Sequence, residues 1–293
     1  MTKREFLTTA TAGLAFARTA LSAAQAPAVR TGSKTGTKRM AKTTKLFRTP
    51  GGFPNALAAT PEGLWIGEQK LSGPAAVSYK LPEPKDLVEH AWLVDWKGKV
   101  LKTVKTNSRN TSGMAVGGGY VWMIANAPPE GVFQVDMNSK EISHRQIPLG
   151  PPTDGGGSHG GQWHENKLWI SSLRLRGNLR VDPKTWTPEL MLPFYQSPGR
   201  TRYHDITFDK EGTIWQVIGN DCSRYADFKP ALVRQDAATG KMLEVVEFMP
   251  GSCDPHGLAY HDGKFYGCDA GIHPGWANYD SPTNGWIFQI DIV

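Results

Sequence analysis

Familiar sequence signatures are scarce in this chain of 293 residues. It has three cysteines, too few for a small fold held together mainly by disulfides. It contains no CxxC pair, no HExxH motif and no GxxxxGK loop, so redox-dithiol, zinc-protease and P-loop chemistry are not indicated. No stretch after residue 26 is long and apolar enough to span a membrane. Any function therefore has to be inferred from longer patterns.

Excess positive charge is also missing from most of the chain, despite a total of +6 at neutral pH. Residues 1–26 carry a net charge of +2 and residues 27–43 a net charge of +5, which leaves residues 44–293 at −1. A protein that binds nucleic acid needs its positive charge on the folded surface. Nucleic acid is therefore excluded as the expected partner.

The first 26 residues have the form of a bacterial export signal peptide. Lys3 and Arg4 precede an Ala- and Thr-rich apolar stretch, and Ala24-Gln25-Ala26 is a small-x-small cleavage site. The Lys-Arg-x-Phe-Leu order resembles a twin-arginine (Tat) signal with Lys replacing the first Arg, and an ordinary Sec signal is the alternative. We expect a periplasmic or secreted protein, not inserted in the membrane after signal removal, with residues 27–43 as a flexible basic linker.

The chain does contain a fivefold repeat. Each copy has a small or polar turn residue, an apolar strand, a turn, and a second strand centred on an aromatic residue. The copies begin 57, 47, 45 and 52 residues apart. They run from Asn55 to Ile66, Ser112 to Met123, His159 to Ile170, His204 to Gln216 and His256 to Gly267. Strand repeats of this length are typical of β-propeller blades.

A second repeat follows the first, as a tight turn between two further strands. An aspartate starts this turn, because its carboxylate can accept backbone N–H groups two residues on. Together the repeats predict an all-β fold over residues 44–293, a five-bladed β-propeller of four-stranded antiparallel blades. The fifth copy has three strands, so we expect the N-terminal strand Thr44–Arg48 to complete it and close the ring.

The cysteines are Cys222, Cys253 and Cys268. An exported protein meets an oxidising compartment. Cys222 and Cys253 fall in loops that the repeat places on one face, which makes a disulfide between them one expected pairing. A bridge between Cys253 and Cys268 is the alternative, and spacing alone does not choose between the two.

The repeat aligns five polar residues at the start of the innermost strand of each blade: Asn55, Ser112, His159, His204 and His256. Innermost strands line the channel of a propeller, so these side chains should ring its mouth. Neutral imidazoles bind divalent metals, and three of them with an open position form a catalytic type of site. We predict a divalent metal ion (Zn, Cu, Fe or Mg) on His159, His204 and His256. The alternative is a polar, water-filled channel lining.

Further polar residues surround this ring. His273, Asp205 and Asp269 are candidates for catalytic proton transfer, and Asp254 is a candidate ligand or orienting partner two residues before His256. Long aromatic loops on the same face predict the walls of a pocket, and nearby arginines favour an anionic or oxygen-rich organic substrate, small or oligomeric. The predicted substrate-binding residues are Asn55, Glu68, Ser112, Arg109, Arg202, Tyr225 and Trp276.

One family resemblance is carried by the fifth copy. Asp254-Pro255-His256-Gly257-Leu258-Ala259, then Asp262-Gly263-Lys264-Phe265-Tyr266, resembles the blade signature of the streptogramin lyase (virginiamycin B lyase) family of propellers. Asp205 to Trp215 is similar to the same unit, and related units occur in NHL-repeat and gluconolactonase-like propellers. The resemblance spans all five copies as a generic repeat. It implies metal-assisted elimination with a histidine base near a divalent ion, and His256 and His273 match that pattern. The chain departs from the family in having five copies instead of seven, longer copies and an export signal.

These patterns predict an exported, metal-dependent propeller enzyme. Elimination next to a carboxyl or carbonyl group (a lyase reaction) is the first expectation and hydrolysis the second. One alternative is a non-catalytic propeller that binds a ligand or a protein. Another is a hydrolase acting on a carbohydrate or an ester, although a glycosidase would need inward carboxylates where this chain has histidines.

Overall fold

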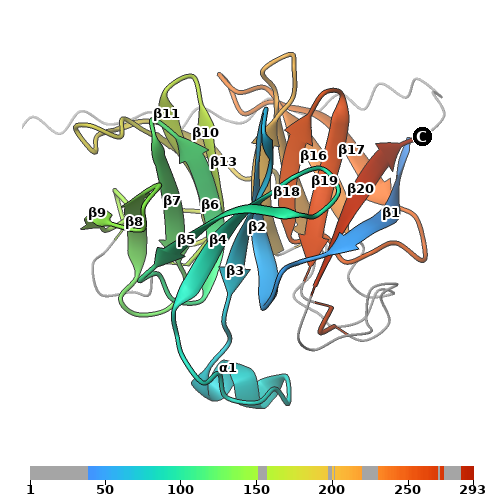
Figure 1. The fold of residues 1–293 in the computed structure, drawn as a ribbon. Helices are drawn as coiled ribbons and strands as arrows, with labels where there is room; N and C mark the ends of the chain where they lie inside the picture. The colour runs from blue at the N-terminus through green and yellow to red at the C-terminus, as the bar shows by residue number, and fades with distance from the viewer. Residues whose placement is uncertain are drawn as a thin grey trace, which may run out of the picture. The chain divides into compact units, whose positions relative to one another are not determined.

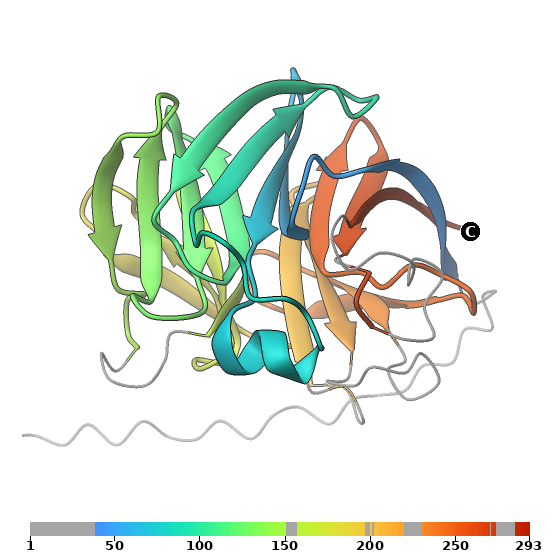
Figure 2. The same ribbon diagram turned by 60° about the horizontal axis from the view of Figure 1, so that its bottom comes forward.

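The structure, a computed structural model, describes residues 39–150, 157–196, 200, 202–219, 230–269, 271–273 and 285–293. The chain divides into two units, residues 1–37 and 38–293, and every described residue belongs to the second. Strands dominate its regular structure (Figure 1). Within the described ranges one short helix, α1 (Gly73–Ser78), lies apart from the sheets (Figure 2). No helix in these ranges has the length and apolar character needed to cross a membrane.

Three four-stranded antiparallel sheets follow one another along the chain, each built from four consecutive strands. The first contains β2 (Phe53–Thr60), β3 (Gly63–Gln69), β4 (Glu89–Val94) and β5 (Val100–Thr106). The second contains β6 (Thr111–Gly117), β7 (Tyr120–Ala125), β8 (Gly131–Asp136) and β9 (Glu141–Arg145). The third contains β10 (Ser158–His164), β11 (Lys167–Ser172), β12 (Gly177–Val181) and β13 (Pro188–Pro193).

A fourth sheet has eight strands in the order β14-β15-β16-β17-β1-β20-β19-β18. Its members are β14 (Arg202–Phe208), β15 (Ile214–Gly219), β16 (Ala231–Gln235), β17 (Met242–Phe248), β18 (Gly257–His261), β19 (Lys264–Asp269), β20 (Trp286–Ile292) and β1 (Met40–Arg48). Strand β1 pairs antiparallel with β20 along most of its length. It pairs in parallel with β17 only at Met40 and Ala41.

The pairing of β1 with β20 confirms that an N-terminal strand completes the sheet of the C-terminal strands. The strand is longer than predicted. It begins at Met40, so residues 40–43 belong to β1 although the sequence assigned them to the linker. Residues 1–26 and most of the linker lie outside the described residues.

Aspartates hold the turns between the third and fourth strands, as the second repeat predicts. The Asp95 carboxylate accepts the backbone N–H groups of Lys97 and Lys99, both at 2.9 Å. Asp136 accepts the corresponding N–H groups of Asn138 and Lys140. The same pattern recurs at Asp182 and Asp236. Each side chain satisfies donors that a tight turn leaves unpaired.

The core lies between neighbouring sheets. The first strands of the repeats contact one another in a closed cycle, from β2 to β6, β10, β14, β18 and back to β2. The tryptophans of the second strands, Trp65, Trp122, Trp169 and Trp215, are at most 3 % exposed. Truncating such a side chain to alanine costs about 3–5 kcal/mol. Antiparallel sheets packed face to face around a cycle of inner strands are the architecture of a β-propeller.

Two of the three cysteines lie in the described ranges. Cys253 and Cys268 are both buried free thiols, so the alternative bridge between them is not formed. Burial raises the pKa of the Cys253 thiol to about 11 and that of Cys268 well above its usual range, which keeps both protonated. Cys222 lies outside the described residues.

Candidate metal and substrate site

Irregular strand pairing positions the aligned polar residues. The register between the first two strands shifts at Pro54/Ala56, Thr111/Gly113, Ser158/Gly161 and Tyr203/Ile206. Four of the aligned residues, Asn55, Ser112, His159 and His204, lie within these shifts. A bulge changes the direction of a side chain relative to the strand. The fifth, His256, directly precedes β18.

Four histidine rings lie in a row at this end of the inner strands. The ring centroids are 5.2 Å apart for His159 and His204, and 4.3 Å apart for His204 and His256. His273 follows at 5.3 Å from His256. All four side chains are buried. Histidines separated by up to 114 positions in the sequence are thus neighbours.

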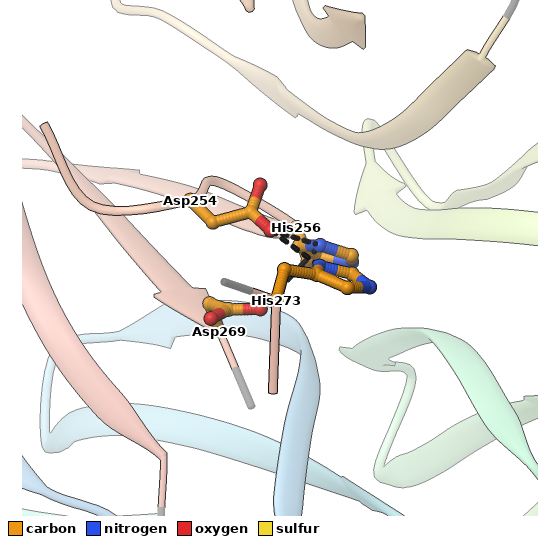
Figure 3. Close-up of side chains that lie close together, drawn as sticks. All are labelled: Asp254, His256, Asp269 and His273. Carbon is orange, nitrogen blue, oxygen red and sulfur yellow. Dashed lines mark hydrogen bonds and ion pairs between the residues drawn. The ribbon is translucent and has the colours of Figure 1, made fainter. Parts of the chain in front are cut away.

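Asp254, His256, Asp269 and His273 form a compact buried group (Figure 3). Their possible ligand atoms all lie within 4.8 Å of one another. His256 Nε2 lies 3.1 Å from Asp254 Oδ2 and 3.4 Å from Asp269 Oδ1. His273 Nδ1 lies 2.6 Å from the same Asp254 oxygen. Imidazole and carboxylate together suit several divalent metals, so this group could hold one.

This donor set differs from the predicted three-histidine set. His256 is common to both, but His159 and His204 are not members of the group that the described residues form. The His204 ring nevertheless lies 4.3 Å from the His256 ring, centroid to centroid, and the His159 ring 5.2 Å from that of His204. The set instead takes Asp254 from the loop before β18, Asp269 from the end of β19, and His273 from the loop that follows.

The charges within the group favour a bound cation. Burial by itself would raise the pKa of Asp254, but His256 and His273 outweigh it and hold that pKa below its usual range. Burial, and next the Asp254 carboxylate, raise the pKa of Asp269. Burial would lower the pKa of His273, yet the hydrogen bond to Asp254 raises it. Two neighbouring buried carboxylates are stabilised by a proton or by positive charge beside them, which a divalent cation could supply.

The other two histidines are neutral and incompletely paired. Burial, followed by nearby cationic groups that include Arg202, lowers the pKa of His159 and His204 well below the usual value. Asn126 Nδ2 lies 3.0 Å from His159 Nε2 and donates to it, which leaves the ring proton on Nδ1. That Nδ1 and the Nε2 of His204 are buried without a hydrogen-bond partner among the described residues. Each of these nitrogens can therefore form a hydrogen bond with water or with a ligand.

A cavity of about 160 Å³ lies beside the histidine row, and His159, His256 and His273 line it. His256, Asp269 and His273 line one part of its wall, and Asn126, His159 and Arg202 line another. Tyr79, the residue at the C-terminal cap of α1, borders the cavity and places its hydroxyl 3.4 Å from His273 Nε2. The cavity therefore joins the candidate metal group to a polar wall.

Several predicted residues come together here. Asn55 and Arg202 line the cavity, as do Asp269 and His273. Ser112 lies beneath the wall, where its hydroxyl accepts hydrogen bonds from Asn55 Nδ2 and Gln69 Nε2, both at 3.2 Å.

Three predicted residues make other contacts. Glu68 Oε2 lies 2.6 Å from His90 Nδ1. Arg109 donates to three backbone carbonyls of its own region, Leu87 among them. The Asp205 carboxylate is fully buried and accepts backbone N–H groups, which leaves it no open face for proton transfer to a substrate. Tyr225 and Trp276 lie outside the described residues.

Sequence reasoning missed the amide side chains of the wall. Gln69, Asn110 and Asn126 all line the cavity. Gln69 ends β3, and Asn126 directly follows β7, so both lie at the end of a second strand. A polar residue just after the aromatic strand was therefore a usable signal. Sequence reasoning assigned roles to Glu68 and Asp269, which lie one position earlier in the repeat than Gln69 and Asn126.

No family model matches this chain, and no curated protein matches it. Among solved structures, it is similar to the glutaminyl cyclase of Myxococcus xanthus, with a TM-score of 0.53 and 11 % identity over 87 % of this chain and 99 % of that one. It is also similar to the tail fiber of Staphylococcus aureus phage P68, with a TM-score of 0.55 and 9 % identity over 85 % of this chain and 52 % of the other. An enzyme and a fiber protein thus share the fold, so the likeness shows the fold alone.

Proposed function

We propose that this chain is a metal-dependent enzyme in which Asp254, His256 and Asp269 hold one divalent ion and His273 moves a proton. The proposal is carried by one observation, the buried group of two imidazoles and two carboxylates that opens onto a polar cavity. Three protein ligands with an open position are typical of a catalytic metal. Unpaired nitrogens on His159 and His204 nearby support a site that accommodates further atoms.

We also infer that the propeller has five blades. The cycle of inner strands has one member from each copy of the repeat. The eight-stranded sheet divides at β1, where the parallel pairing with β17 involves two residues and the antiparallel pairing with β20 involves seven. On this division β14–β17 form one blade and β18–β20 with β1 form another. The resemblance to the streptogramin lyase-like propellers supports the fold and the reaction class and assigns no substrate.

The cavity wall favours a small, hydroxylated carboxylate as substrate. Arg202 supplies a cation for the carboxylate, and His159 holds its proton on Nδ1, from which it can donate to a substrate oxygen. Asn55 donates through Nδ2 to Ser112, which leaves its Oδ1 as an acceptor without a partner among the described residues. That oxygen suits a substrate hydroxyl.

The proposed reaction is elimination next to the substrate carboxyl group. A divalent ion held by Asp254, His256 and Asp269 would supply a Lewis acid for the carboxyl or carbonyl oxygen. His273 Nε2 accepts the proton from the adjacent carbon, while Nδ1 donates to Asp254 Oδ2 at 2.6 Å and so stabilises the imidazolium. The C–H electron pair becomes the new C=C bond, and the leaving oxygen departs with its own pair and takes a proton from water.

The test is turnover of small hydroxy carboxylates, followed by the ultraviolet absorbance of the conjugated C=C bond. We expect turnover to stop after chelation and to return with a divalent metal. His273→Gln should keep the metal and lose about 100-fold in rate, whereas His256→Ala should lose the metal. Release of an acid and an alcohol from an ester of such a hydroxy acid, without the chromophore, would indicate hydrolysis. Neither metal nor turnover would indicate a non-catalytic binding propeller.

Export is a separate proposal, supported by the first 26 residues alone. We propose that the protein is carried to the periplasm or secreted through a twin-arginine pathway, where Lys3 and Arg4 are the basic pair. Replacing Arg4 by Lys should leave the precursor inside the cell if that pathway is used. Continued export would favour the Sec pathway.

A further inference from the structure

We propose that Asp205 is a positioning residue whose single carboxylate ties four innermost strands together and so fixes the polar ring of the candidate site. Its side chain is fully buried on β14, directly after His204. Oδ1 accepts the N–H groups of Gly161 at 3.1 Å and Ile206 at 3.0 Å. Oδ2 accepts those of Leu57 and Leu258, both at 3.1 Å.

The four donors occupy the same position in the repeat. Each lies two residues after one of the aligned polar residues: Leu57 after Asn55, Gly161 after His159, Ile206 after His204 and Leu258 after His256. They belong to β2, β10, β14 and β18. One carboxylate therefore contacts equivalent backbone atoms in four copies, which is possible only where these strands approach one another most closely.

These hydrogen bonds supply acceptors for backbone N–H groups at the inner edges of the sheets. The inner edge of each sheet has no further strand to pair with, and a buried N–H without an acceptor costs about 1–3 kcal/mol. Burial raises the pKa of Asp205 well above its usual range, and the four N–H groups oppose that rise because they stabilise the carboxylate form. A carboxylate has about four lone-pair sites, so it can accept from four such donors at once. A neutral amide of the same shape would turn one acceptor into a donor.

The neighbouring glycines show how tightly the carboxylate is enclosed. A Cβ atom on Gly160 would lie 2.8 Å from Asp205 Cα and 3.0 Å from its Oδ1. On Gly161, a Cβ would meet Ile124 Cδ1 at 2.7 Å. The backbone that follows His159 can reach the Asp205 side chain because these two residues lack side chains.

The N–H groups bound by Asp205 lie close in the chain to the polar residues of the candidate site. Only two peptide units separate each anchored N–H from the polar residue of the same strand. The Asp205 backbone N–H also donates to the His256 carbonyl at 3.3 Å. Asp205 thus holds the two backbone groups that directly follow the His256 Cα, its carbonyl and the Leu258 N–H, and so restrains where the ring lies. The effect on metal binding rests on the proposed function, whereas the positioning role itself does not.

The experiment compares Asp205→Asn with Asp209→Asn. Asp209 is a matched control because it follows the same strand, is buried, and accepts N–H groups from Glu211, Thr213 and the Trp215 ring. Two readouts are taken on the mature protein: Co²⁺ affinity by titration, and hydrogen exchange of the Leu57, Gly161 and Leu258 amides.

We expect Asp205→Asn to weaken Co²⁺ binding about 10- to 100-fold and to speed exchange of those three amides, while Asp209→Asn changes neither. Equal effects of both variants on Co²⁺ would overturn the proposal, because they would report general destabilisation. Unchanged exchange in Asp205→Asn would overturn it as well. If the wild-type protein binds no Co²⁺, the proposed function fails, and amide exchange still decides the role of Asp205.

A second measurement covers the case in which Asp205→Asn does not fold. In the wild-type protein, the amides of Leu57, Gly161 and Leu258 should exchange only through global unfolding, because their acceptor is buried on the axis of the fold. Exchange through local fluctuations, at rates typical of exposed strand edges, would contradict the proposal.

Discussion

At the residue scale, Asp254 has the greatest influence on the candidate site. One of its oxygens faces both His256 and His273, so it contributes to the ligand set and orients the proton carrier. Asp254→Asn should therefore weaken metal binding by at least 10-fold and also remove the raised pKa of His273. Metal titration and the pH dependence of the His273 ring resonances would check both effects. An unchanged His273 pKa in the variant would contradict this assignment.

Glu89, which is not a member of the candidate metal group, should make the free energy of unfolding depend on pH. It is fully buried on β4 and accepts the N–H groups of Lys70 at 2.7 Å and Thr111 at 3.0 Å. Burial raises its pKa from 4.5 to about 7. Between these two pH values the folded protein binds a proton on Glu89 that the unfolded chain does not. The stabilisation from this proton is therefore complete below about pH 4.5 and is lost as the pH rises through about 7.

The linkage relation gives a loss of about 3 kcal/mol in the free energy of unfolding over this pH range. The free energy of unfolding, measured in urea from pH 4 to pH 8, should fall more steeply in the wild type than in Glu89→Gln. The prediction concerns the difference in slope, because the variant also alters two hydrogen bonds at every pH. Parallel curves would contradict it.

The aligned polar residues at strand starts could be found from sequence because they depend on register. Asn55, His159 and His256 were predicted in this way, and all three border the cavity. The partners of His256 could not be chosen, because they depend on side-chain direction in loops. Asp254 and Asp205 looked alike in sequence, yet one faces two imidazoles and the other faces four backbone amides.

At the scale of elements, β1 has the largest single effect on the fold. It pairs with β20 over seven residues and with β17 over two, and Ala41 is fully buried in the cluster that contains Trp215. Its Thr43 hydroxyl accepts the Cys253 N–H at 2.8 Å, next to Asp254. The strand therefore links the closure of the fold to the loop that carries the site.

Deleting residues 39–48 should expose the edges of β17 and β20 and cause loss of cooperative unfolding or aggregation. A synthetic peptide of residues 39–48 added in trans should restore the folded state, because an open edge can accept a matching strand. Circular dichroism and urea unfolding would measure the recovery, with a scrambled peptide as the control. A truncated chain as stable as the mature protein would show that β1 is dispensable.

The strands were predictable because turn chemistry marks their ends. Asp95, Asp136, Asp182 and Asp236 hold the turns that the second repeat predicts. Helix α1 was not predicted, since its six residues are too few to show a helical period. Its position matters for the site, because it leads into Tyr79 beside His273.

At the scale of the whole molecule, the fold and the site follow from different parts of the sequence. The repeat specifies a ring of similar sheets, and that symmetry made the architecture predictable. The candidate metal group breaks the symmetry, because its members come from one sheet and its adjoining loops. Extending the symmetry to the ligands gives the three-histidine set, which stays a prediction, and the structure adds two carboxylates close to His256.

A bound metal should raise the stability of the whole protein. At a free concentration 100 times its dissociation constant, a ligand that binds only the folded state adds about 2.7 kcal/mol. Thermal unfolding with added metal and with chelator should therefore give midpoints that differ by several degrees. The His256→Ala variant, which lacks a ligand, should show no such difference. A shift of equal size in that variant would place the stabilising metal elsewhere.

The most direct test of the central claim is anomalous X-ray scattering from crystals of the mature protein grown with a divalent transition metal. We predict one strong peak per chain at about 2.0–2.3 Å from atoms of Asp254, His256 and Asp269. A peak centred on His159 and His204, or crystals with no peak near these side chains, would contradict the account.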